Sequence, residues 1–411
     1  MHILVLADNF VPEQNAPALR TYEHCRRWVE NGVAVTVITT VPNFPLGKPQ
    51  PPYRNRLYQR EQIDGIDVIR VWTFLAANKG VVRRALDFFS FATSSFFAGL
   101  FQRPDVILAT SPQLLTPASG RLLSGFKGRP WVFEVRDLWP ESIVAVGAMK
   151  EGMIVRMLAR LERSLYRNAS RIVTLTEPMR VRILEHGIPA DKVGVVSNGV
   201  GRLRLARRAR DEALAARWGI SGKFVVGYVG TLGMAQGLEV VVHAADHLRN
   251  SDIHFLFVGE GARRDELEAL VKKLDLSNVT FVGMVPAEVA ADYLALSDCV
   301  VVPLKPSKLF DVSMPSKIFE AAAMEKPIIL SARGYSAEVL QRYQAGLVVE
   351  PGNPEALAGA IASLRQDDQM QKRFQTGCAS LAAAFDRLSL ADLMLAEIQR
   401  AMQPRRPVIE G

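Results

Sequence analysis

The sequence predicts an α/β fold made of two doubly wound domains, each a mostly parallel β-sheet with helices on both faces. Short apolar runs, bounded by polar or proline residues, alternate with helical segments along most of the chain. Such runs are typical of strands that are buried on both faces of a parallel sheet. The alternation occurs in two successive arrays of similar size, and 411 residues are too many for one ordinary hydrophobic core. We therefore expect one domain from each array.

The first array begins with a strand at 3–7 and an amphipathic helix at 18–30, which ends at Gly32. Further strands are expected at 34–39, 66–71, 105–109, 131–135, 171–175 and 193–196. Helical segments between these strands would make the crossovers that parallel pairing requires. A turn signal at 197–200 follows the last strand, so we expect the first domain to cover residues 1–198.

The second array repeats the pattern and predicts a second domain at 199–388. Its strands are expected at 224–228, 254–258, 279–282, 299–303, 328–330 and 346–349. Its helices are expected at 238–249, 265–274, 354–366 and 370–385. A last helix within 389–404 is expected to return to the first domain, and the residues after Pro404 are expected to form a loose tail.

Charge and composition limit the classes of partner. The net charge of +8 suits an anionic partner such as a nucleotide or a membrane surface. Nucleic acid is not expected, because the sequence has no zinc finger, RNA-stacking motif or basic heptad region. Three widely spaced cysteines argue against disulfides and a zinc site, and favour a cytoplasmic location. We expect neither a signal peptide nor a membrane-spanning helix, since no sufficiently long apolar run is present.

The stretch 310–330 carries the most informative arrangement of charges. Pro315 precedes a short helix that starts near Ser316, and within it Lys317 and Glu320 share one face. The rest of this helix is small and apolar, so the two charges need a partner, and a helix N-terminus is a natural place for phosphate. We hypothesise a site for a phosphorylated, hydroxyl-rich ligand. The alternative is an ordinary surface pair between Lys317 and Glu320.

Polar or glycine-rich loops follow the predicted strands in both arrays. They lie at 8–15, 110–113 and 136–142 in the first array, and at 230–237, 259–264, 283–286 and 310–320 in the second. Open α/β sheets bind ligands at the carboxyl ends of their strands, where glycines let backbone N–H groups approach phosphate. We expect the two sets of loops to face each other across a cleft. ATPase chemistry is not expected, because no Gly-Lys-Ser/Thr phosphate loop is present.

Six short motifs carry a family likeness: NGV at 198–200, YVGTLG at 228–233, FVGEG at 257–261, FVGMV at 281–285, SDCVVVP at 297–303 and PSKIFEAAAMEKPI at 315–328. Through these motifs the chain resembles, along nearly its whole length, family-four glycosyltransferases of the two-domain GT-B fold. Two more runs, PEQNAPALR at 12–20 and RDLWPES at 136–142, are similar to bacterial enzymes of surface-polysaccharide assembly, including colanic-acid and O-antigen types. Those enzymes typically add a sugar, often an N-acetylated one, to a glycan on a polyprenyl-diphosphate carrier.

The resemblance implies two Rossmann-like domains. The N-terminal domain would bind the acceptor, and the C-terminal domain would bind the nucleotide sugar. Glu320 matches the family glutamate that binds the ribose hydroxyls, a role suited to a carboxylate. Lys317 matches a cation often found three positions before this glutamate, and its expected role is near the diphosphate or the Glu320 carboxylate. The other donor-binding residues implied are Asn15, Ala16, Gly230, Thr231, Gly233, Met284, Val285, Pro315 and Ser316.

Three positions depart from the family pattern. Val312 stands where the family commonly has a second glutamate, so Asp311 becomes the nearest acidic candidate. Gln236-Gly237 replaces the usual basic pair after Gly230, so Arg263, Arg264 or Lys317 would have to supply the positive charge. Asn15-Ala16 replaces a pair of glycines in the first loop.

The implied chemistry is retaining transfer from a UDP-sugar, with N-acetylated hexosamines among the candidates, to a lipid-linked oligosaccharide. No Asp-x-Asp run is present for a metal–diphosphate bridge, so dipoles and cations of the protein would stabilise the leaving group, and neither a metal nor another cofactor is expected. The catalytic candidates are Asp137, Glu320 and Asp311; capping of the following helix is the alternative for Asp137. The expected acceptor contacts are Asn9, Gln14, Arg20, Arg136 and Glu141.

Two segments are candidates for contact with the inner face of the cytoplasmic membrane. Residues 83–101 contain six phenylalanines and begin with two arginines. We favour a buried crossover helix for most of these residues, and an interfacial helix is the alternative. The basic run 202–210 predicts a solvated helix face that could touch lipid head groups. His243 and His247 are interpreted as helix-surface residues, because no third metal ligand is evident.

Two other functions stay open at this point. A GT-B sugar-nucleotide epimerase would share the two-domain architecture, but we identify no acid/base set for it. A non-catalytic nucleotide-sugar-binding protein is suggested by the missing second glutamate at Val312.

Overall fold

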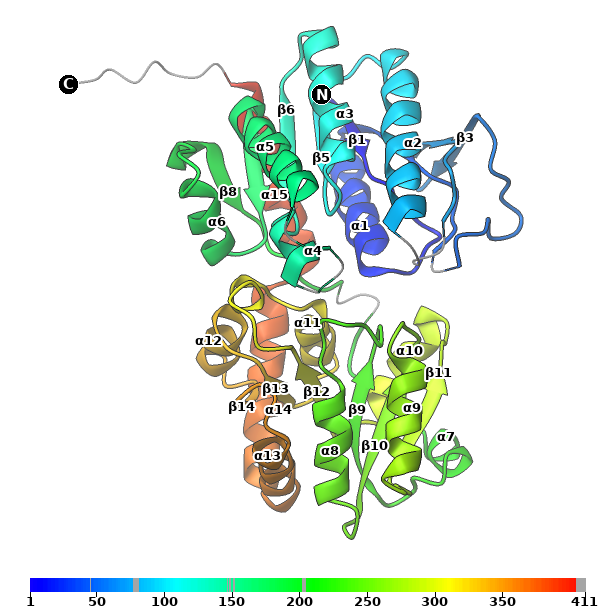
Figure 1. Ribbon diagram of the computed structural model, residues 1–411, viewed down its shortest axis with the longest axis vertical. Helices are drawn as coiled ribbons and strands as arrows, with labels where there is room; N and C mark the ends of the chain where they lie inside the picture. The colour runs from blue at the N-terminus through cyan, green and yellow to red at the C-terminus, as the bar shows by residue number, and fades with distance from the viewer. Residues whose placement is uncertain are drawn as a thin grey trace, which may run out of the picture. The chain divides into compact units, whose positions relative to one another are not determined.

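In the computed structural model the chain forms two compact units, Met1–Ser197 with Arg387–Gly411, and Asn198–Asp386. The structure describes residues 1–44, 46–76, 81–145, 147, 149–150, 152–201 and 205–403. The expected tail after Pro404 lies outside these residues. The unit boundaries fall close to those that the turn signal at 197–200 and the segment 389–404 predict. Each unit contains one sheet (Figure 1).

The N-terminal unit has a sheet of eight strands in the order β3-β4-β2-β1-β5-β6-β7-β8. The strands are β1 (His2–Leu6), β2 (Ala34–Thr39), β3 (Tyr58–Ile63), β4 (Ile66–Val71), β5 (Val106–Thr110), β6 (Trp131–Val135), β7 (Arg171–Thr174) and β8 (Val193–Val195). All neighbours pair in parallel except β3, which runs antiparallel to β4. The sequence did not predict β3, because this edge strand is polar and half-exposed and so lacks an apolar run.

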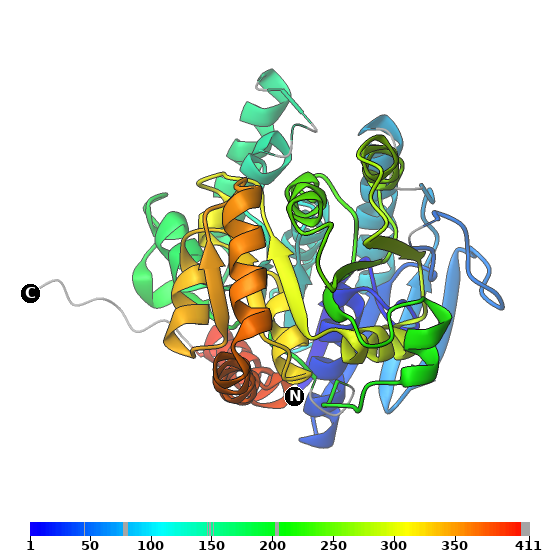
Figure 2. The same cartoon turned by 90° about the horizontal axis from the view of Figure 1, so that it is seen from below.

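Helices cover both faces of this sheet. They are α1 (Ala16–Glu30), α2 (Val81–Leu100), α3 (Leu115–Lys127), α4 (Glu141–Ala145), α5 (Met153–Asn168), α6 (Glu177–Leu184), η1 (Ala190–Lys192) and α15 (Arg387–Met402). Figures 1 and 2 show α2, α3 and α5 on one face and α1 and α15 on the other.

The return of α15 to the N-terminal unit is held by polar contacts with α1. The indole Nε1 of Trp28 donates to the carbonyl oxygen of Ala391 at 2.8 Å. Arg27 binds Asp392 through two nitrogens, with its Nη2 at 2.8 Å from Oδ2. Trp28 is fully buried, so its indole N–H needs the partner that α15 provides. The expected crossing of the C-terminal helix is therefore present, with its bounds at Arg387–Met402.

The C-terminal unit has a six-stranded, wholly parallel sheet in the order β11-β10-β9-β12-β13-β14. Its strands are β9 (Phe224–Val229), β10 (Ile253–Val258), β11 (Val279–Gly283), β12 (Cys299–Pro303), β13 (Ile328–Ser331) and β14 (Gly346–Val349). Its helices are α7 (Glu212–Arg217), α8 (Glu239–His247), α9 (Arg264–Lys273), α10 (Ala287–Leu296), η2 (Phe310–Val312), α11 (Ser316–Ala323), α12 (Tyr335–Arg342), α13 (Pro354–Gln366) and α14 (Asp368–Ala384).

Two hydrophobic clusters form the core of this unit, one on each face of the sheet. Alternate residues of β9 belong to different clusters: Val225 faces α10 and α11, and Val226 faces α8 and α13. This alternation is the period of two that a strand imposes on its side chains. Because both faces are covered, the strands consist of nearly continuous apolar residues, and this made them recognisable in the sequence.

The basic run 202–210 is not a helix in its described part, which corrects the prediction of a solvated helix face. Residues 202–204 lie outside the described residues, and 205–210 form an irregular segment of the C-terminal unit. Arg207 pairs with Glu325 at 2.9 Å, Arg208 with Asp292 at 2.7 Å, and Arg210 with Asp298 at 3.2 Å. These pairs already compensate the charges that the lipid contact would use.

A buried carboxyl group on α5 gives a testable pH dependence of stability. Burial raises the pKa of Glu162 from 4.5 to about 7, although its Oε1 accepts a 2.6 Å hydrogen bond from the Tyr166 hydroxyl. The folded state therefore holds this proton more tightly than the unfolded chain, so the wild type loses stability as the pH rises from about 4.5 to about 7. The Glu162→Gln variant lacks this ionisation.

Relative to the wild type, Glu162→Gln should gain about 2 kcal/mol in unfolding free energy between pH 5 and pH 8. Thermal melts of both proteins across this range would measure the difference. Arg160→Gln, an exposed charge change on the same helix, is the matched control and should show no such change. A stability difference between Glu162→Gln and wild type that does not vary with pH would contradict the prediction.

Candidate functional site

Three neighbouring strands of the C-terminal sheet end at glycines in the left-handed region. Gly230 follows β9 with φ 137°, Gly259 follows β10 with φ 136°, and Gly283 ends β11 with φ 90°. A Cβ atom on Gly259 would lie 2.1 Å from the carbonyl oxygen of Gly230, so the two chains approach closely only because no side chain is present. The backbone amide of Gly230 donates to Val258 and that of Gly259 to Gly283, both at 2.8 Å. At this carboxyl edge the backbone of Gly230 and Gly259 is partly exposed, and that of Gly283 is buried.

Helix α11 brings Lys317 to this glycine edge. A Cβ atom on Gly230 would lie 2.5 Å from the Lys317 side chain, and the Lys317 Nζ is 5.2 Å from the centre of the Tyr228 ring. The Tyr228 hydroxyl in turn donates to the carbonyl oxygen of Thr231 at 2.6 Å. Lys317, in the first turn of α11, thus lies next to Gly230 in the loop that follows β9. Tyr228 is a neighbour that the sequence analysis did not single out, although it opens the run at 228–233.

Lys317 and Glu320 do not form the ordinary surface pair that the sequence left open. Among the described residues, no carboxylate lies within 4 Å of the Lys317 ammonium, and the Glu320 side chain has no hydrogen-bond partner. Both side chains are partly exposed, on the same helical face. Pro315 provides no side-chain acceptor for the first turn of α11, which starts at Ser316 as predicted. A carboxylate and an ammonium are therefore both available to a ligand.

Arg263 and Arg264 do not provide the free positive charge expected of them. Arg263 pairs with Glu266 at 2.7 Å and lies 3.6 Å from Glu239. Arg264 pairs with Glu268 at 2.7 Å and also with Glu260. Glu266 and Glu268 are on α9, Glu239 is on α8, and Glu260 is in the loop after β10. Together these carboxylates compensate both guanidinium groups. Lys317 remains the better candidate for contact with a diphosphate.

Unsatisfied polar atoms mark the same edge. The Gln236 Oε1 and the Arg263 Nε are buried without a hydrogen-bond partner among the described residues. A Cβ atom on Gly233 would lie 2.7 Å from the Gln236 Oε1, which places this amide against the predicted phosphate loop. Buried polar atoms are normally satisfied in the folded protein, so the Gln236 oxygen can still accept and the Arg263 nitrogen can still donate a hydrogen bond. Gln236 entered the sequence analysis only as a departure from the family pattern.

The remaining donor candidates lie on loops of the same unit. Met284, which follows β11, is exposed, and Val285 is half-buried. Asp311 lies in η2, partly exposed, and a Cβ atom on Gly334 would be 2.1 Å from its carbonyl oxygen. The close approach of Gly334 fixes the turn that precedes α11. These residues are thus placed on the loops that follow β11 and β12.

In the N-terminal unit, Asn15 is the N-cap of α1. Its Oδ1 accepts from the Ala18 amide at 2.9 Å, and its Nδ2 donates to the Asn9 Oδ1 at 2.8 Å. The structure therefore joins two candidates of different predicted roles, donor and acceptor binding, in one capping arrangement. Ala16 is the first residue of α1, and Gln14 is exposed in the loop before it.

Arg20 does not fit the predicted acceptor contact. It is 2% exposed, and its guanidinium binds the carboxylate of Glu134 on β6, which is also buried. Although burial alone would raise the pKa of Glu134, the charges of Arg20 and Arg136 lower it below its usual value. Burial, together with the nearby cations, also lowers the pKa of His24 well below 6.5. Arg20 is therefore a structural residue that compensates a buried carboxylate.

Arg136 and Asp137 follow β6 at the carboxyl edge of the N-terminal sheet. The Arg136 amide donates to the Ser111 Oγ at 2.8 Å, and its Nε is buried without a partner among the described residues. The Asp137 side chain is open to solvent on one side, but the protein around it disfavours ionisation and raises its pKa to about 6, against the opposing effect of Arg136. Helix α4 begins at Glu141, so Asp137 is not its N-cap.

Glu141 forms an ion pair with a side chain of another helix. Its Oε2 binds the Arg182 Nη2 on α6 at 2.9 Å, and both side chains are about half-exposed. The pair is the simplest account of Glu141, and an acceptor contact stays a prediction. Trp139 packs edge-on against Phe88 of α2, with ring centres 6.3 Å apart.

Three carboxyl groups near this edge did not enter the list of candidates. Burial raises the pKa of Asp8, and Glu13 is 2% exposed and accepts from the Asn43 and Phe44 amides at 2.7 and 2.9 Å. Burial and the charge of Asp8 raise the pKa of Asp87, on α2, to about 7. Asp8 and Glu13 are in the loop that the sequence indicated, whereas Asp87 is hidden within a phenylalanine-rich helix.

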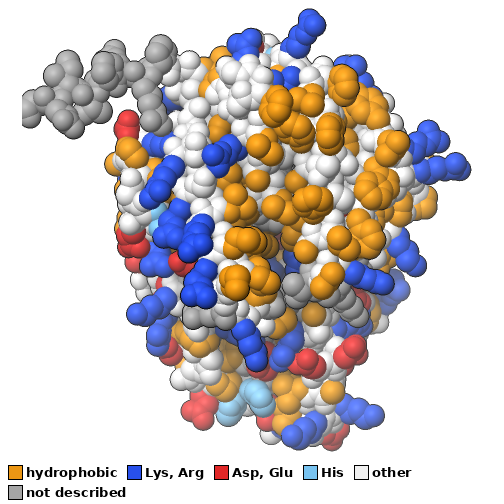
Figure 3. Space-filling model, turned by 45° about the horizontal axis from the view of Figure 1, so that its top comes forward, with side chains coloured by type: hydrophobic (Ala, Val, Ile, Leu, Met, Phe, Trp, Pro, Cys, Tyr) orange, Lys and Arg blue, Asp and Glu red, His pale blue; other side chains and the backbone are white. Residues whose placement is uncertain are grey.

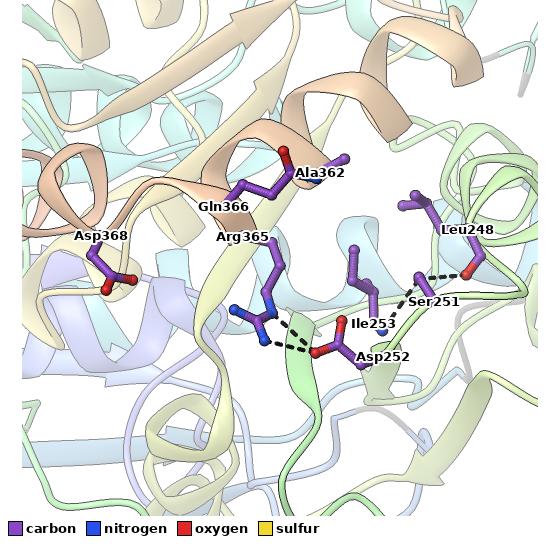
Figure 4. Close-up of a pocket in the computed structure, with 8 residues that line it drawn as sticks. All are labelled: Leu248, Ser251, Asp252, Ile253, Ala362, Arg365, Gln366 and Asp368. Atoms are coloured by element: carbon purple, nitrogen blue, oxygen red, sulfur yellow. Dashed lines mark hydrogen bonds and ion pairs between the residues drawn. The ribbon is translucent and has the colours of Figure 1, made fainter.

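Other candidate sites are less informative. Among the described residues, no group of three or more His, Cys, Asp or Glu has a metal-binding arrangement, and His243 and His247 are exposed on α8. A surface pocket lies instead at the amino ends of the C-terminal strands, next to Asp252 and Ile253 (Figure 4). Two of its three charged side chains neutralise each other, because Arg365 binds Asp252 at 2.7 Å. We place the functional site at the carboxyl edge rather than in this pocket.

Comparisons with known proteins match both units. A model described as "Glycosyl transferase 4-like domain" matches residues 15–199, and one described as "Glycosyl transferases group 1" matches residues 223–367. The putative colanic acid biosynthesis glycosyl transferase WcaI of Escherichia coli is 28% identical over 89% of this chain and 92% of its own length. The probable glycosyltransferase WbjE of Pseudomonas aeruginosa is 28% identical over 65% of this chain and 68% of its own.

Solved structures show the same fold. HepE of Anabaena in complex with UDP aligns with 97% of this chain and 100% of its own, with a TM-score of 0.71 and 17% identity. Sucrose-phosphate synthase of Thermosynechococcus elongatus covers 97% of this chain and 98% of its own, with a TM-score of 0.77 and 19% identity. The two family models together span most of the chain, and two Rossmann-like units underlie both matches. The chain therefore belongs to the group 1, family-four glycosyltransferases of the GT-B fold and is a glycosyltransferase enzyme.

Proposed function

We propose that this enzyme is a retaining, metal-independent glycosyltransferase that moves a sugar from a UDP-sugar to a lipid-linked oligosaccharide in surface-polysaccharide assembly. The observation that carries the proposal is the arrangement of Lys317 and Glu320, neither of which forms an ion pair among the described residues, beside the glycine-ended strands β9 to β11. The name of WcaI supports polysaccharide assembly, and HepE in complex with UDP supports the choice of nucleotide.

In this proposal the C-terminal unit binds the donor and the N-terminal unit binds the acceptor. Glu320 accepts hydrogen bonds from the ribose hydroxyls, and Lys317 with the backbone around Gly230 stabilises the diphosphate. Met284 and Val285 lie where the base would contact backbone. The acceptor oxygen attacks the anomeric carbon from the face that the diphosphate leaves, a phosphate oxygen takes the acceptor proton, and UDP departs. Because the sequence has no Asp-x-Asp run, protein groups carry the leaving-group charge.

Nucleotide binding tests the donor half of the proposal. UDP should raise the melting temperature of the protein, whereas ADP and GDP at equal concentration should not, since only a ligand of the folded state stabilises it. A screen of radiolabelled UDP-sugars with polyprenyl-diphosphate-linked acceptors then identifies the transferred sugar. Indifference to all nucleoside diphosphates would overturn the UDP-donor proposal. Conversion of a UDP-N-acetylhexosamine without any acceptor would replace transfer by epimerisation.

We infer that Asp137 positions the sugar or acceptor as a carboxylate, and this role has a pH signature. With a pKa of about 6, Asp137 gains a proton as the pH falls through that value, so the transfer rate should fall about tenfold per pH unit below it. Asp137→Asn should lower kcat about 10²-fold at pH 8 and remove this acidic limb. Glu177→Gln, which only breaks an exposed ion pair with Arg180 on α6, is the matched control. An unchanged acidic limb in Asp137→Asn would assign the ionisation to another group.

A further inference from the structure

The outward face of α2 is an uninterrupted stripe of exposed, mainly apolar side chains. The stripe follows steps of three and four residues and consists of Val82, Leu86, Phe89, Thr93 and Phe97, with Phe101 just after the helix. Phe101 is 83% exposed and Phe89 is 64% exposed. The opposite side of the helix is in the core, where Phe91 is buried. The expectation of a mostly buried crossover helix is therefore wrong for this stripe.

Two further helices of the same face extend the apolar surface. Phe126 and Leu122 are exposed on α3, and Met153, Ile154 and Met157 are exposed on α5. The rings of Phe96 and Phe126 meet at 5.4 Å, and the Arg121 Nη1 of α3 donates to the Ser164 Oγ of α5 at 2.7 Å. The three helices thus form one continuous layer, which we call the α2–α3–α5 surface. Figure 3 shows hydrophobic side chains gathered on a face of the molecule, with Lys and Arg around them.

The charges on the α2–α3–α5 surface have one sign. The exposed charged residues in the described parts of these helices are Arg83, Arg156, Arg160, Arg163 and Arg167. The acidic side chains on the same helices are turned inward: Glu162 is 6% exposed and bonded to Tyr166, and Asp87 is half-buried. Among the described residues, Arg156 and Arg160 have no ion-pair partner. This combination of an apolar centre and uncompensated arginines is complementary to a partner that is apolar in its interior and anionic at its boundary.

We propose that the α2–α3–α5 surface docks onto the interface of an anionic lipid bilayer, with the phenylalanines and methionines among the acyl chains and the arginines on the phosphate head groups. Docking of this kind lies in the membrane plane, and none of the described helices is long and apolar enough to cross a membrane. A second copy of the chain would leave the arginines facing each other, because the surface has no exposed acidic counterpart.

The proposal rests on the lipid-linked acceptor proposed above and gives it a location. Asp87 on the inner side of α2 interacts electrostatically with Asp8, which follows β1 at the carboxyl edge of the N-terminal sheet. The docked face is therefore next to the edge where we place acceptor binding. A carrier lipid could remain in the bilayer while its attached glycan reaches Asp137 and its neighbours.

Vesicle co-sedimentation tests the proposal without any sugar nucleotide, so its outcome is separate from that of the transfer assay. The full chain should sediment with vesicles of phosphatidylglycerol and phosphatidylcholine, and much less with phosphatidylcholine alone. The variant Phe89→Ser/Phe101→Ser/Phe126→Ser should bind at least tenfold more weakly. Arg156→Gln/Arg160→Gln should lower the partition coefficient about fivefold for each arginine, and high salt should reproduce this loss.

Matched controls separate docking from misfolding. Val181→Ser/Leu393→Ser alters apolar side chains of similar exposure on α6 and α15, outside the α2–α3–α5 surface, and should bind vesicles as the wild type does. Melting temperatures of all variants show that the fold is kept. Wild-type protein that ignores anionic vesicles at low salt would overturn the proposal. So would a dimer in solution that the phenylalanine variant abolishes while vesicle binding stays unchanged.

Discussion

Replacing Glu320 with alanine should lower the rate of sugar transfer about 10²-fold or more, because the donor loses the contact that positions its ribose. The structure leaves this carboxylate partly exposed and without a hydrogen-bond partner among the described residues, so its removal does not disturb a protein contact. The melting temperature of the free protein should therefore hardly change, while its increase with UDP should shrink. Steady-state transfer assays and thermal melts with UDP measure the two effects.

Two controls sharpen this test. Glu320→Gln keeps the size of the side chain and one acceptor oxygen, so it should retain more activity than Glu320→Ala. Glu338→Ala removes an exposed carboxylate from α12 in the same unit and should leave transfer unchanged. If Glu320→Ala transferred sugar at the wild-type rate, the nucleotide would have to be held elsewhere. The unpartnered amide of Gln236 would then be the next position to change.

Replacing Arg20 with alanine should destabilise the N-terminal unit by about 3–5 kcal/mol, because Glu134 would remain as a buried and uncompensated carboxylate. Both side chains are almost fully buried, 2% and 4% exposed, so water cannot replace the lost partner. The loss should be largest at neutral pH and smaller in acid, where the unpaired Glu134 can take up a proton. Chemical unfolding at pH 7 and pH 5 measures it.

The double variant Arg20→Met/Glu134→Gln should recover much of this stability, since it removes both charges and keeps most of the volume. Arg26→Ala breaks an exposed pair with Glu30 on the same helix and should change stability by less than about 1 kcal/mol. If Arg20 instead contacted the acceptor, its replacement would affect acceptor binding and not stability. An Arg20→Ala variant with wild-type stability but a raised KM for the acceptor would restore that role and refute the structural one.

The sequence by itself was sufficient for most of the strands and for the position of α11. Buried parallel strands are nearly continuous apolar runs, so β2, β4, β6, β12 and β14 have the predicted bounds. The helix start at Ser316 and the shared face of Lys317 and Glu320 depend on neighbouring residues alone, and the structure has both. The edge strand β3 was missed because its polar residues carry no such local signal.

Only the tertiary structure decided which charges are free and which apolar side chains are covered. Arg20, Arg263 and Arg264 are similar cations in the sequence, but Glu134 of β6 and the carboxylates around α9 compensate them in the fold. The phenylalanines of α2 are the same residue type but lie in two environments, since Phe91 is buried in the core and Phe97 is exposed to solvent. Residues distant in the chain therefore determine both which charges are compensated and which apolar side chains are buried. A sequence pattern reports the period of a helix or strand, whereas compensation of charge and removal from water depend on what folds against it.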